Sequence, residues 1–300
     1  MHASTIIRET ADVRCVGENA AMTSVEHADP ETSALKNAVR TFWDAASCGE
    51  VYAEGDDPCA RLRSHARARY ALEPYIFAFA GFADGAGKDV LEVGVGMGAD
   101  HAEWARVGPR TLSGVDLTPR AVEHTKARLA CEGLVSDLRV ADAEMLPYDD
   151  ASFDLVYSWG VLHHSPDPPR AIREVFRVLR PGGTARIMIY HQWSLVGYML
   201  WLRYALLAGR PWRSLRDVYA HHLESPGTKA YTLGEARAML HGFRAVRVRS
   251  QLSFGDLLEG AVGQRHGGAL LRAAKALWPR WLLKRVFARH GLMLLIEAQK

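Results

Sequence analysis

The chain has 300 residues, of which 48% are hydrophobic and 24% are charged, and its formal net charge is +3. This composition is ordinary for a globular protein that buries a full core, and it excludes a disordered or fibrous chain. The small net charge gives no argument for a nucleic-acid partner by itself, and we predict none.

Cysteine usage and apolar runs suggest the compartment. Four cysteines, at positions 15, 48, 59 and 131, form no CxxC pair and have no histidine at metal-ligand spacing, so we expect reduced thiols. The N-terminal sequence MHASTIIRETADVR carries charges where an export signal needs an unbroken apolar stretch. The longest apolar run, residues 195–208, contains Arg203 and is too short to span a bilayer. These features predict a cytoplasmic protein.

The N-terminal part reads as a tail followed by helices. Residues 1–31 lack periodicity and predict a mobile tail. A helical cap is expected over residues 32–87, because apolar residues recur at helical spacing over 33–46 and again over 62–83. Pro74 should kink or restart the second of these helices.

The eleven residues VLEVGVGMGAD, from Val90 to Asp100, organise the rest of the chain. They predict a buried strand that runs into a glycine-rich loop, where the backbone can approach a nucleotide-like ligand closely. Strands and helices then alternate, which predicts a parallel sheet with helices on both faces. We expect helices at 99–107, 119–131 and 169–179, and strands at 110–116, 138–142, 153–158 and 184–190.

The last third departs from simple alternation. A hydrophobic helix and turn rich in aromatic residues is expected at 193–212, then a helix at 233–240 and strands at 243–252 and 292–298. Residues 260–290 carry seven lysines and arginines and no acid, with apolar residues at three- and four-residue spacing. This pattern predicts basic amphipathic helices that break or restart at Pro279.

Two acidic residues bear on the choice of ligand. Asp116 ends the second strand, eighteen residues beyond Gly98, where a carboxylate can accept hydrogen bonds from ribose hydroxyls. Both nicotinamide and S-adenosylmethionine proteins use this arrangement, and the loop also satisfies the dinucleotide pattern GxGxxA. Glu92 favours the sulfonium cofactor, because a carboxylate beside the loop would repel a pyrophosphate but attract an ammonium group.

Four blocks in order resemble those of class I S-adenosylmethionine-dependent methyltransferases of the small-molecule group. They are VLEVGVGMG at 90–98, GVDLT at 114–118, ADAEMLP at 141–147, and FDLVYSWGVLHH through VLRPGG at 153–183. The resemblance implies an α/β, Rossmann-like, seven-stranded and mostly parallel sheet over residues 88–300, with helical insertions at 192–230 and 254–290. It also implies that the last strand lies antiparallel between the fifth and sixth strands.

The resemblance further implies which residues bind S-adenosyl-L-methionine, at the carboxyl ends of the strands. The methionine moiety would lie against Glu92, Gly94, Val95, Gly96 and Gly98, the ribose against Asp116, the adenine against Leu117, Asp142 and Ala143, and the sulfonium near Trp159 and Gly160.

Methyl transfer mainly requires proximity and orientation, and a base is needed only where the acceptor must lose a proton. His163 and His164 follow the fourth strand on the expected active-site side and are candidates, unless they only hold the loop. Tyr190, at the end of the fifth strand, is a further candidate. No ligand spacing supports a metal site, and we predict none.

We therefore expect methyl transfer to a small-molecule acceptor that is largely hydrophobic, and anionic if the basic stretch 260–290 covers the acceptor site. One alternative is a lipid or isoprenoid amphiphile methylated at a membrane surface, with 260–290 as the peripheral contact. A nicotinamide-dependent oxidoreductase and a non-catalytic binding protein are the others. The same basic helices are also compatible with a homodimer interface. The sequence does not decide whether oxygen, nitrogen or carbon receives the methyl group.

Overall fold

The computed structural model describes residues 29–259 and 278–300. The expected tail and much of the expected basic stretch, residues 260–277, lie outside the described residues.

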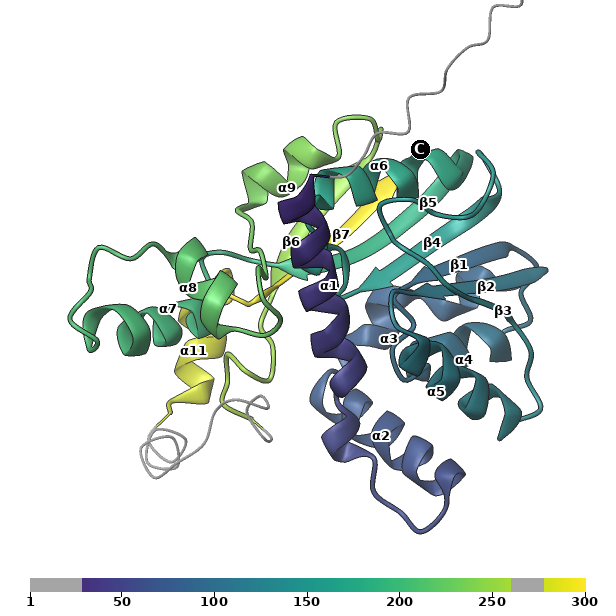
Figure 1. Cartoon of the computed structure of the whole chain (residues 1–300), viewed down its shortest axis with the longest axis horizontal. Coiled ribbons are helices and arrows are strands. Elements are labelled where there is room, and N and C mark those ends of the chain that lie inside the picture. Colours follow the sequence, from purple (N-terminus) through teal and green to yellow (C-terminus); the bar gives the residue numbers. More distant parts are fainter. Residues whose placement is uncertain (1–28, 260–277) are drawn as a thin grey trace, which may run out of the picture.

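A seven-stranded sheet runs through the centre of the molecule in the order β3-β2-β1-β4-β5-β7-β6 (Figure 1). Strands β1 to β5 are parallel to one another, and β7 is antiparallel to both β5 and β6. The expected fold class is therefore confirmed, including the last strand between the fifth and sixth. The strands are β1 (Asp89–Val93), β2 (Thr111–Asp116), β3 (Asp137–Val140), β4 (Phe153–Trp159), β5 (Leu179–Tyr190), β6 (Val246–Gln251) and β7 (Met293–Gln299).

The central strands are buried on both faces, as expected for a covered parallel sheet. Val90 and Leu155 belong to one hydrophobic cluster, whereas their chain neighbours Leu91 and Val156 belong to the other. All four side chains have at most 1% of their surface exposed. The alternation of side chains along each strand thus supplies two cores from one continuous apolar run.

Helices α4 (Ala99–Arg106), α5 (Pro119–Ala130), α6 (Pro168–Val178) and α9 (Leu233–Met239) connect and cover the strands. At the first turn of α5, α6 and α9, a side chain satisfies a free backbone N–H, so local sequence specifies where these three helices start. Thr118 accepts from the Ala121 N–H, and Asp167 accepts from the Arg170 N–H. Thr232 forms a full capping box with Glu235 at the start of α9.

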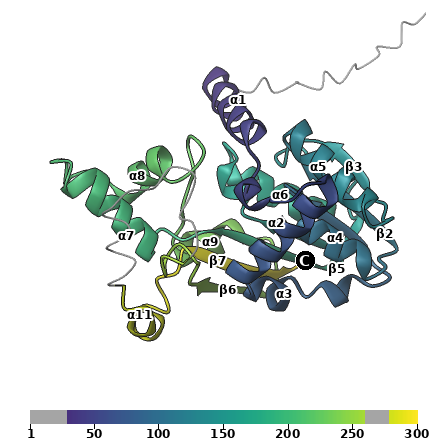
Figure 2. The same ribbon diagram turned by 90° about the horizontal axis from the view of Figure 1, so that it is seen from below.

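Three N-terminal helices, α1 (Pro30–Ala45), α2 (Pro58–Leu72) and α3 (Tyr75–Ala80), lie beside the sheet (Figures 1 and 2). Pro74 separates α2 from α3, as predicted. The expectation of reduced thiols is wrong for one pair, because Cys59 of α2 forms a disulfide with Cys131 at the end of α5. These residues are 72 positions apart, so no local spacing could reveal that α2 packs on α5.

A helical lobe projects beyond the β5 and β7 side of the sheet (Figure 1). It contains α7 (Leu195–Trp201), which continues into a π-helical turn η4 (Leu202–Leu206), together with α8 (Leu215–His222) and α11 (Arg280–Val286). The sequence predicted α7 but not α8. Within the two described ranges, no helix combines the length and the apolar character that crossing a bilayer requires.

Candidate functional site

The loop after β1 has the backbone geometry that only glycine adopts readily. Gly94, Gly96 and Gly98 have φ angles of +86°, +52° and +73°. A Cβ at Gly94 would lie 2.0 Å from a methyl group of Val161, so a larger residue would displace the loop after β4. A Cβ at Gly96 would meet no atom within 4 Å, so open space adjoins the loop there.

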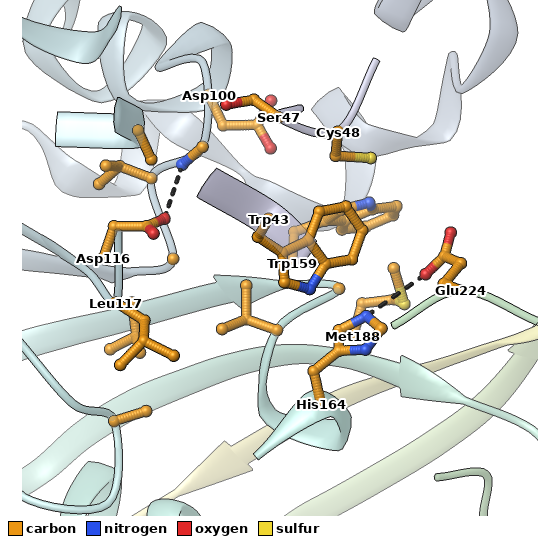
Figure 3. Close-up of a pocket in the computed structure, with 18 of the residues that line it drawn as sticks. Trp43, Ser47, Cys48, Asp100, Asp116, Leu117, Trp159, His164, Met188 and Glu224 are labelled. Atoms are coloured by element: carbon orange, nitrogen blue, oxygen red, sulfur yellow. Dashed lines mark hydrogen bonds and ion pairs between the residues drawn. The ribbon is translucent and has the colours of Figure 1, made fainter. Parts of the chain in front are cut away.

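The carboxyl ends of β1, β2, β4 and β5 open into one cavity of about 280 Å³ (Figure 3). The structure brings nearly all of the predicted cofactor residues to this cavity. Gly98 is the exception, since it packs against Thr125 instead. The residues at the cavity are Glu92, Gly94, Val95, Gly96, Asp116, Leu117, Asp142, Ala143, Trp159 and Gly160.

Hydrogen bonds from the loops after β1 and β2 orient the Asp116 carboxylate. Its Oδ2 accepts a hydrogen bond from the Gly96 N–H at 3.1 Å, and its Oδ1 accepts from the N–H and the hydroxyl of Thr118, both at 3.0 Å. Burial raises the pKa of Asp116, and these donors oppose that rise. The carboxylate is thus held at the cavity wall beside Leu117 (Figure 3).

Glu92 ends in a buried chain of hydrogen bonds. Its Oε2 lies 3.0 Å from Nδ1 of His101, whose Nε2 lies 2.8 Å from the Ser136 hydroxyl. Burial and the nearby charge of Asp100 raise the pKa of Glu92 well above its ordinary value. Burial lowers the pKa of His101 to about 3, so this imidazole is neutral.

The side chain of Asp142 is already engaged. Its Oδ1 accepts from the Glu144 N–H at 2.9 Å, and its Oδ2 accepts from the ammonium group of Lys36 on α1. Lys36 also donates to Glu144 at 2.7 Å. These contacts therefore fasten helix α1 to the loop after β3 at the cavity wall, and no sequence motif indicated them.

A buried charge network links α2 to α4 beside the cavity. Arg69 of α2 donates to both carboxylate oxygens of Asp100, at 2.9 and 2.6 Å, and Tyr157 donates to the same carboxylate at 2.8 Å. Burial alone would raise the pKa of Asp100, but Arg69 and the tyrosines hold it below its ordinary value. Burial raises the pKa of Glu73, at the end of α2, to about 7 although Arg69 opposes the rise. Arg69 and Glu73 both line the cavity.

The opposite end of the cavity carries an imidazole and a carboxylate. His164 lies on η3 (Leu162–His164), directly after β4, and its Nδ1 is 2.8 Å from the Ser225 hydroxyl. Its Nε2 is 3.3 Å from Oε2 of Glu224, which also accepts from the Tyr190 hydroxyl at 2.8 Å. The ring of Trp43 contacts the His164 ring edge-on, with centroids 5.2 Å apart (Figure 3).

Of the three predicted catalytic residues, the structure brings His164 and Tyr190 to the cavity but not His163. His163 is fully buried with its ring 3.9 Å from that of Tyr190. Burial and the neighbouring His164 lower its pKa well below the ordinary value. Ligand atoms of His163, His164 and Glu224 all lie within 4.8 Å of one another and could together hold a metal ion. Sequence spacing could not suggest this grouping, because Glu224 is 60 positions from His164.

Sequence reasoning missed several residues of the cavity wall. The sequence predicted a helical cap over residues 32–87 but no site residue within it. A helix that lies over a cavity has the same apolar spacing as one that covers a core, so the sequence offers no separate signal. The missed residues are Lys36, Trp43, Arg69, Glu73 and Glu224.

Comparison with known proteins agrees with this geometry. Residues 91–187 match a family described as a methyltransferase domain. The chain is 41% identical over 101 residues to the 27-O-demethylrifamycin SV methyltransferase of Amycolatopsis mediterranei, covering 33% of this chain and 37% of that protein. It is 42% identical over 98 residues to the phthiotriol/phenolphthiotriol dimycocerosates methyltransferase of Mycobacterium tuberculosis, covering 32% and 36%.

Each of these matches spans less than half the length of the curated relative. A solved S-adenosylmethionine-dependent methyltransferase from Mesorhizobium loti has the same fold. Its TM-score is 0.52 at 19% identity, over 75% of this chain and 97% of that one.

Proposed function

We propose that this chain, whose residues 91–187 form a class I S-adenosylmethionine-dependent methyltransferase domain, transfers a methyl group to a hydroxyl group of a largely hydrophobic small molecule. One observation carries the proposal. A single cavity joins the residues of the glycine loop and Asp116 to the His164 and Glu224 pair. A cofactor at one end and a proton acceptor at the other are what such a transfer requires.

The residues present fit S-adenosylmethionine, which is the cofactor that the family and fold imply. The open space at Gly96 admits a close approach to the backbone, and the ordered Asp116 carboxylate suits two ribose hydroxyls. Leu117 and Ala143 would pack on the adenine, with Asp142 shared between its amino group and Lys36. When bound, this cofactor supplies an activated methyl carbon whose bond to sulfur breaks as its bond to the acceptor oxygen forms.

The acceptor's proton passes to the His164 and Glu224 pair. The Glu224 side chain is 31% exposed, so an acceptor in the cavity can reach its carboxylate, while His164 lies behind it at 6%. Because Nε2 and Oε2 are 3.3 Å apart, the two groups share the proton that the hydroxyl loses. Tyr190 orients the carboxylate by donating to the same oxygen.

The walls of the acceptor end favour an apolar and uncharged molecule. Trp43, Trp159 and Met188 supply apolar surface, whereas Glu224 is acidic. An anion would be repelled by the Glu224 carboxylate, so the anionic acceptor expected from the sequence is not part of the proposal. One relative is named for 27-O-demethylrifamycin SV, in which the missing methyl group belongs on an oxygen, and this name supports a hydroxyl acceptor.

The proposal is tested by methyl transfer to matched pairs of probes, 1-naphthol with 1-naphthylamine and 1-dodecanol with dodecylamine. We expect the hydroxyl compounds to be methylated, and His164→Gln and Glu224→Gln each to lower kcat by about 100-fold or more, since a positioned base contributes that much. The affinity for S-adenosylhomocysteine, measured by calorimetry, should stay unchanged in both variants.

Two controls sharpen this test. His221→Gln removes an exposed histidine of α8 that lies outside the cavity, and it should leave kcat unchanged. A chelator distinguishes a proton shared by His164 and Glu224 from a metal ion bound by His163, His164 and Glu224. Only the metal alternative predicts loss of activity with chelator. Methylation of the amines alone would contradict the hydroxyl assignment.

A further inference from the structure

The helical lobe exposes large apolar side chains that would ordinarily be buried. Along η4 and the turn after it, Leu207 is 72% exposed and Trp212 is 78% exposed. On α11, Trp281 is 73% exposed and Val286 is 61% exposed. Scattered apolar residues need no explanation, but several large apolar side chains exposed on one lobe indicate an interaction surface.

Helix α11 packs on α7, the helix that continues into η4. Leu195 of α7 and Leu283 of α11 share a hydrophobic cluster with Leu257. Asp256 is buried between them, where it accepts from the Val196 N–H at 3.1 Å, and its carbonyl accepts from the Trp278 indole at 3.0 Å. The inward contacts of α11 therefore use Leu283, whereas Trp281 and Val286 face away from the core.

The charge of these segments is one-sided. Residues 193–213 and 278–290 contain no aspartate or glutamate. Among the described residues, no carboxylate lies within ion-pair distance of Arg203, Arg285 or Arg289, in contrast to surface arginines such as Arg106 and Arg177. Lys284 approaches Glu259 only at 3.6 Å and remains 56% exposed. The lobe thus offers basic groups beside its exposed apolar ones.

We propose that this lobe, formed by α7, η4 and α11, docks on an anionic phospholipid bilayer. Tryptophan and leucine side chains enter the boundary between headgroups and acyl chains, while arginine and lysine meet lipid phosphates. A protein partner of mixed charge would leave some of these basic groups without counter-charges, so the lack of acids in residues 193–213 and 278–290 favours a lipid surface. The inference goes beyond the proposed function, because binding to a bilayer does not require methyl transfer.

The lobe also adjoins the acceptor end of the cavity. Phe254 and Gly255 line the cavity, and they belong to the segment that Asp256 ties to α7 and α11. A Cβ at Gly255 would be 3.3 Å from Val196 of α7, which shows how closely the two walls approach. A docked lobe therefore places the cavity wall next to the lipid surface, where an amphiphilic acceptor would be concentrated.

Vesicle sedimentation of the full chain tests the inference. The probes are vesicles of phosphatidylcholine alone and of phosphatidylcholine with 30% phosphatidylglycerol, at low and at physiological salt. We expect at least tenfold stronger binding to the anionic vesicles, weakened by salt. The double variant Trp212→Ser/Trp281→Ser should lose at least tenfold, and Arg285→Gln/Arg289→Gln should lose the preference for anionic vesicles.

Matched controls replace residues of the same type outside the lobe. Val135→Ser removes an apolar side chain that is 88% exposed between α5 and β3, and Arg61→Gln removes an exposed charge on α2. Both should bind vesicles as the native chain does. The melting temperature and the affinity for S-adenosylhomocysteine should be unchanged in every variant, which separates this test from the proposed function.

Three outcomes would overturn the inference: no binding to anionic vesicles, equal loss in the control variants, or unchanged binding in the double tryptophan variant. Light scattering distinguishes a lipid-binding surface from an interface between two copies of this chain. A dimer in solution that Trp281→Ser dissociates, with no vesicle binding, would assign the surface to a second copy of this chain instead.

Discussion

At Glu92 the hydrogen bonds decide which atom carries a proton. The Ser136 hydroxyl donates to the Leu112 carbonyl at 2.9 Å, so it accepts from Nε2–H of His101. Nδ1 of the neutral imidazole is then bare and faces Glu92 at 3.0 Å. The contact is satisfied only if Glu92 holds the proton, which agrees with the upward direction of its pKa.

We predict that cofactor binding ionises Glu92. An ammonium group placed beside the carboxylate favours the charged form, so S-adenosylhomocysteine should release about one proton per site at pH 7. Calorimetry in two buffers of different ionisation enthalpy measures this release. Glu92→Gln should bind more weakly and release none, and equal proton release by the variant would exclude Glu92 as the source.

At the scale of elements, the sequence predicted those helices and strands that local residue patterns specify. Strand β1 and helices α5 and α6 follow from apolar runs, prolines at the first turn and capping side chains. Helix α8 was missed because its eight residues include an aspartate, an arginine and two histidines, which obscure the apolar spacing. Contacts between α1 and the loop after β3 join residues more than 100 positions apart and leave no local trace.

The disulfide between α2 and α5 is the clearest case of such a distant contact. We predict that the denatured, unreduced chain exposes at most two of its four cysteines to a thiol reagent, because Cys59 and Cys131 are joined. Reduction should lower the free energy of unfolding by about 2–4 kcal/mol, since the bond constrains a long loop of the unfolded chain. Urea unfolding with and without reductant measures the change.

Cys59→Ser/Cys131→Ser provides the matched control for reduction. Its stability should equal that of the reduced native chain and should not respond to reductant. Four reactive thiols in the denatured, unreduced chain would contradict the disulfide directly.

At the scale of the whole molecule, the cavity wall at the ends of β1, β2 and β3 was largely predictable, and the wall around His164 was not. The glycine loop, Asp116 and Asp142 lie in continuous blocks at strand ends, where the sheet topology brings them together. The wall around His164 also includes Trp43 and Glu224, which lie far before and far after His164 in the sequence. Only packing in three dimensions assembles these three side chains.

Buried titratable groups of opposite sign shape the pH dependence of stability. Burial and the charge of Arg128 lower the pKa of His65 to about 4, and its Nδ1 accepts from Arg128 at 3.1 Å. Between pH 4 and about 6.5 the unfolded chain binds this proton and the native chain does not. Stability therefore falls as the pH is lowered through this window, by about 3 kcal/mol for this group. His65→Gln keeps an acceptor for Arg128 and should remove that slope in urea titrations.

The pKa shift of Glu73 changes the stability with pH in the opposite direction to that of His65. Its native pKa of about 7 lies above the ordinary value of 4.5, so the native chain holds a proton that the unfolded chain has lost between these pH values. Stability then decreases as the pH rises from 4.5 to 7, because the ionised carboxylate is costly in its buried position beside Asp100. Glu73→Gln should gain about 3 kcal/mol relative to the native chain between pH 4.5 and pH 8, at one unit of pKa per about 1.4 kcal/mol. The gain is read as the change in the difference between the two urea curves, which cancels any fixed effect of losing the contact with Arg69. A difference that stays constant with pH would show that Glu73 is ionised throughout and that Arg69 outweighs its burial.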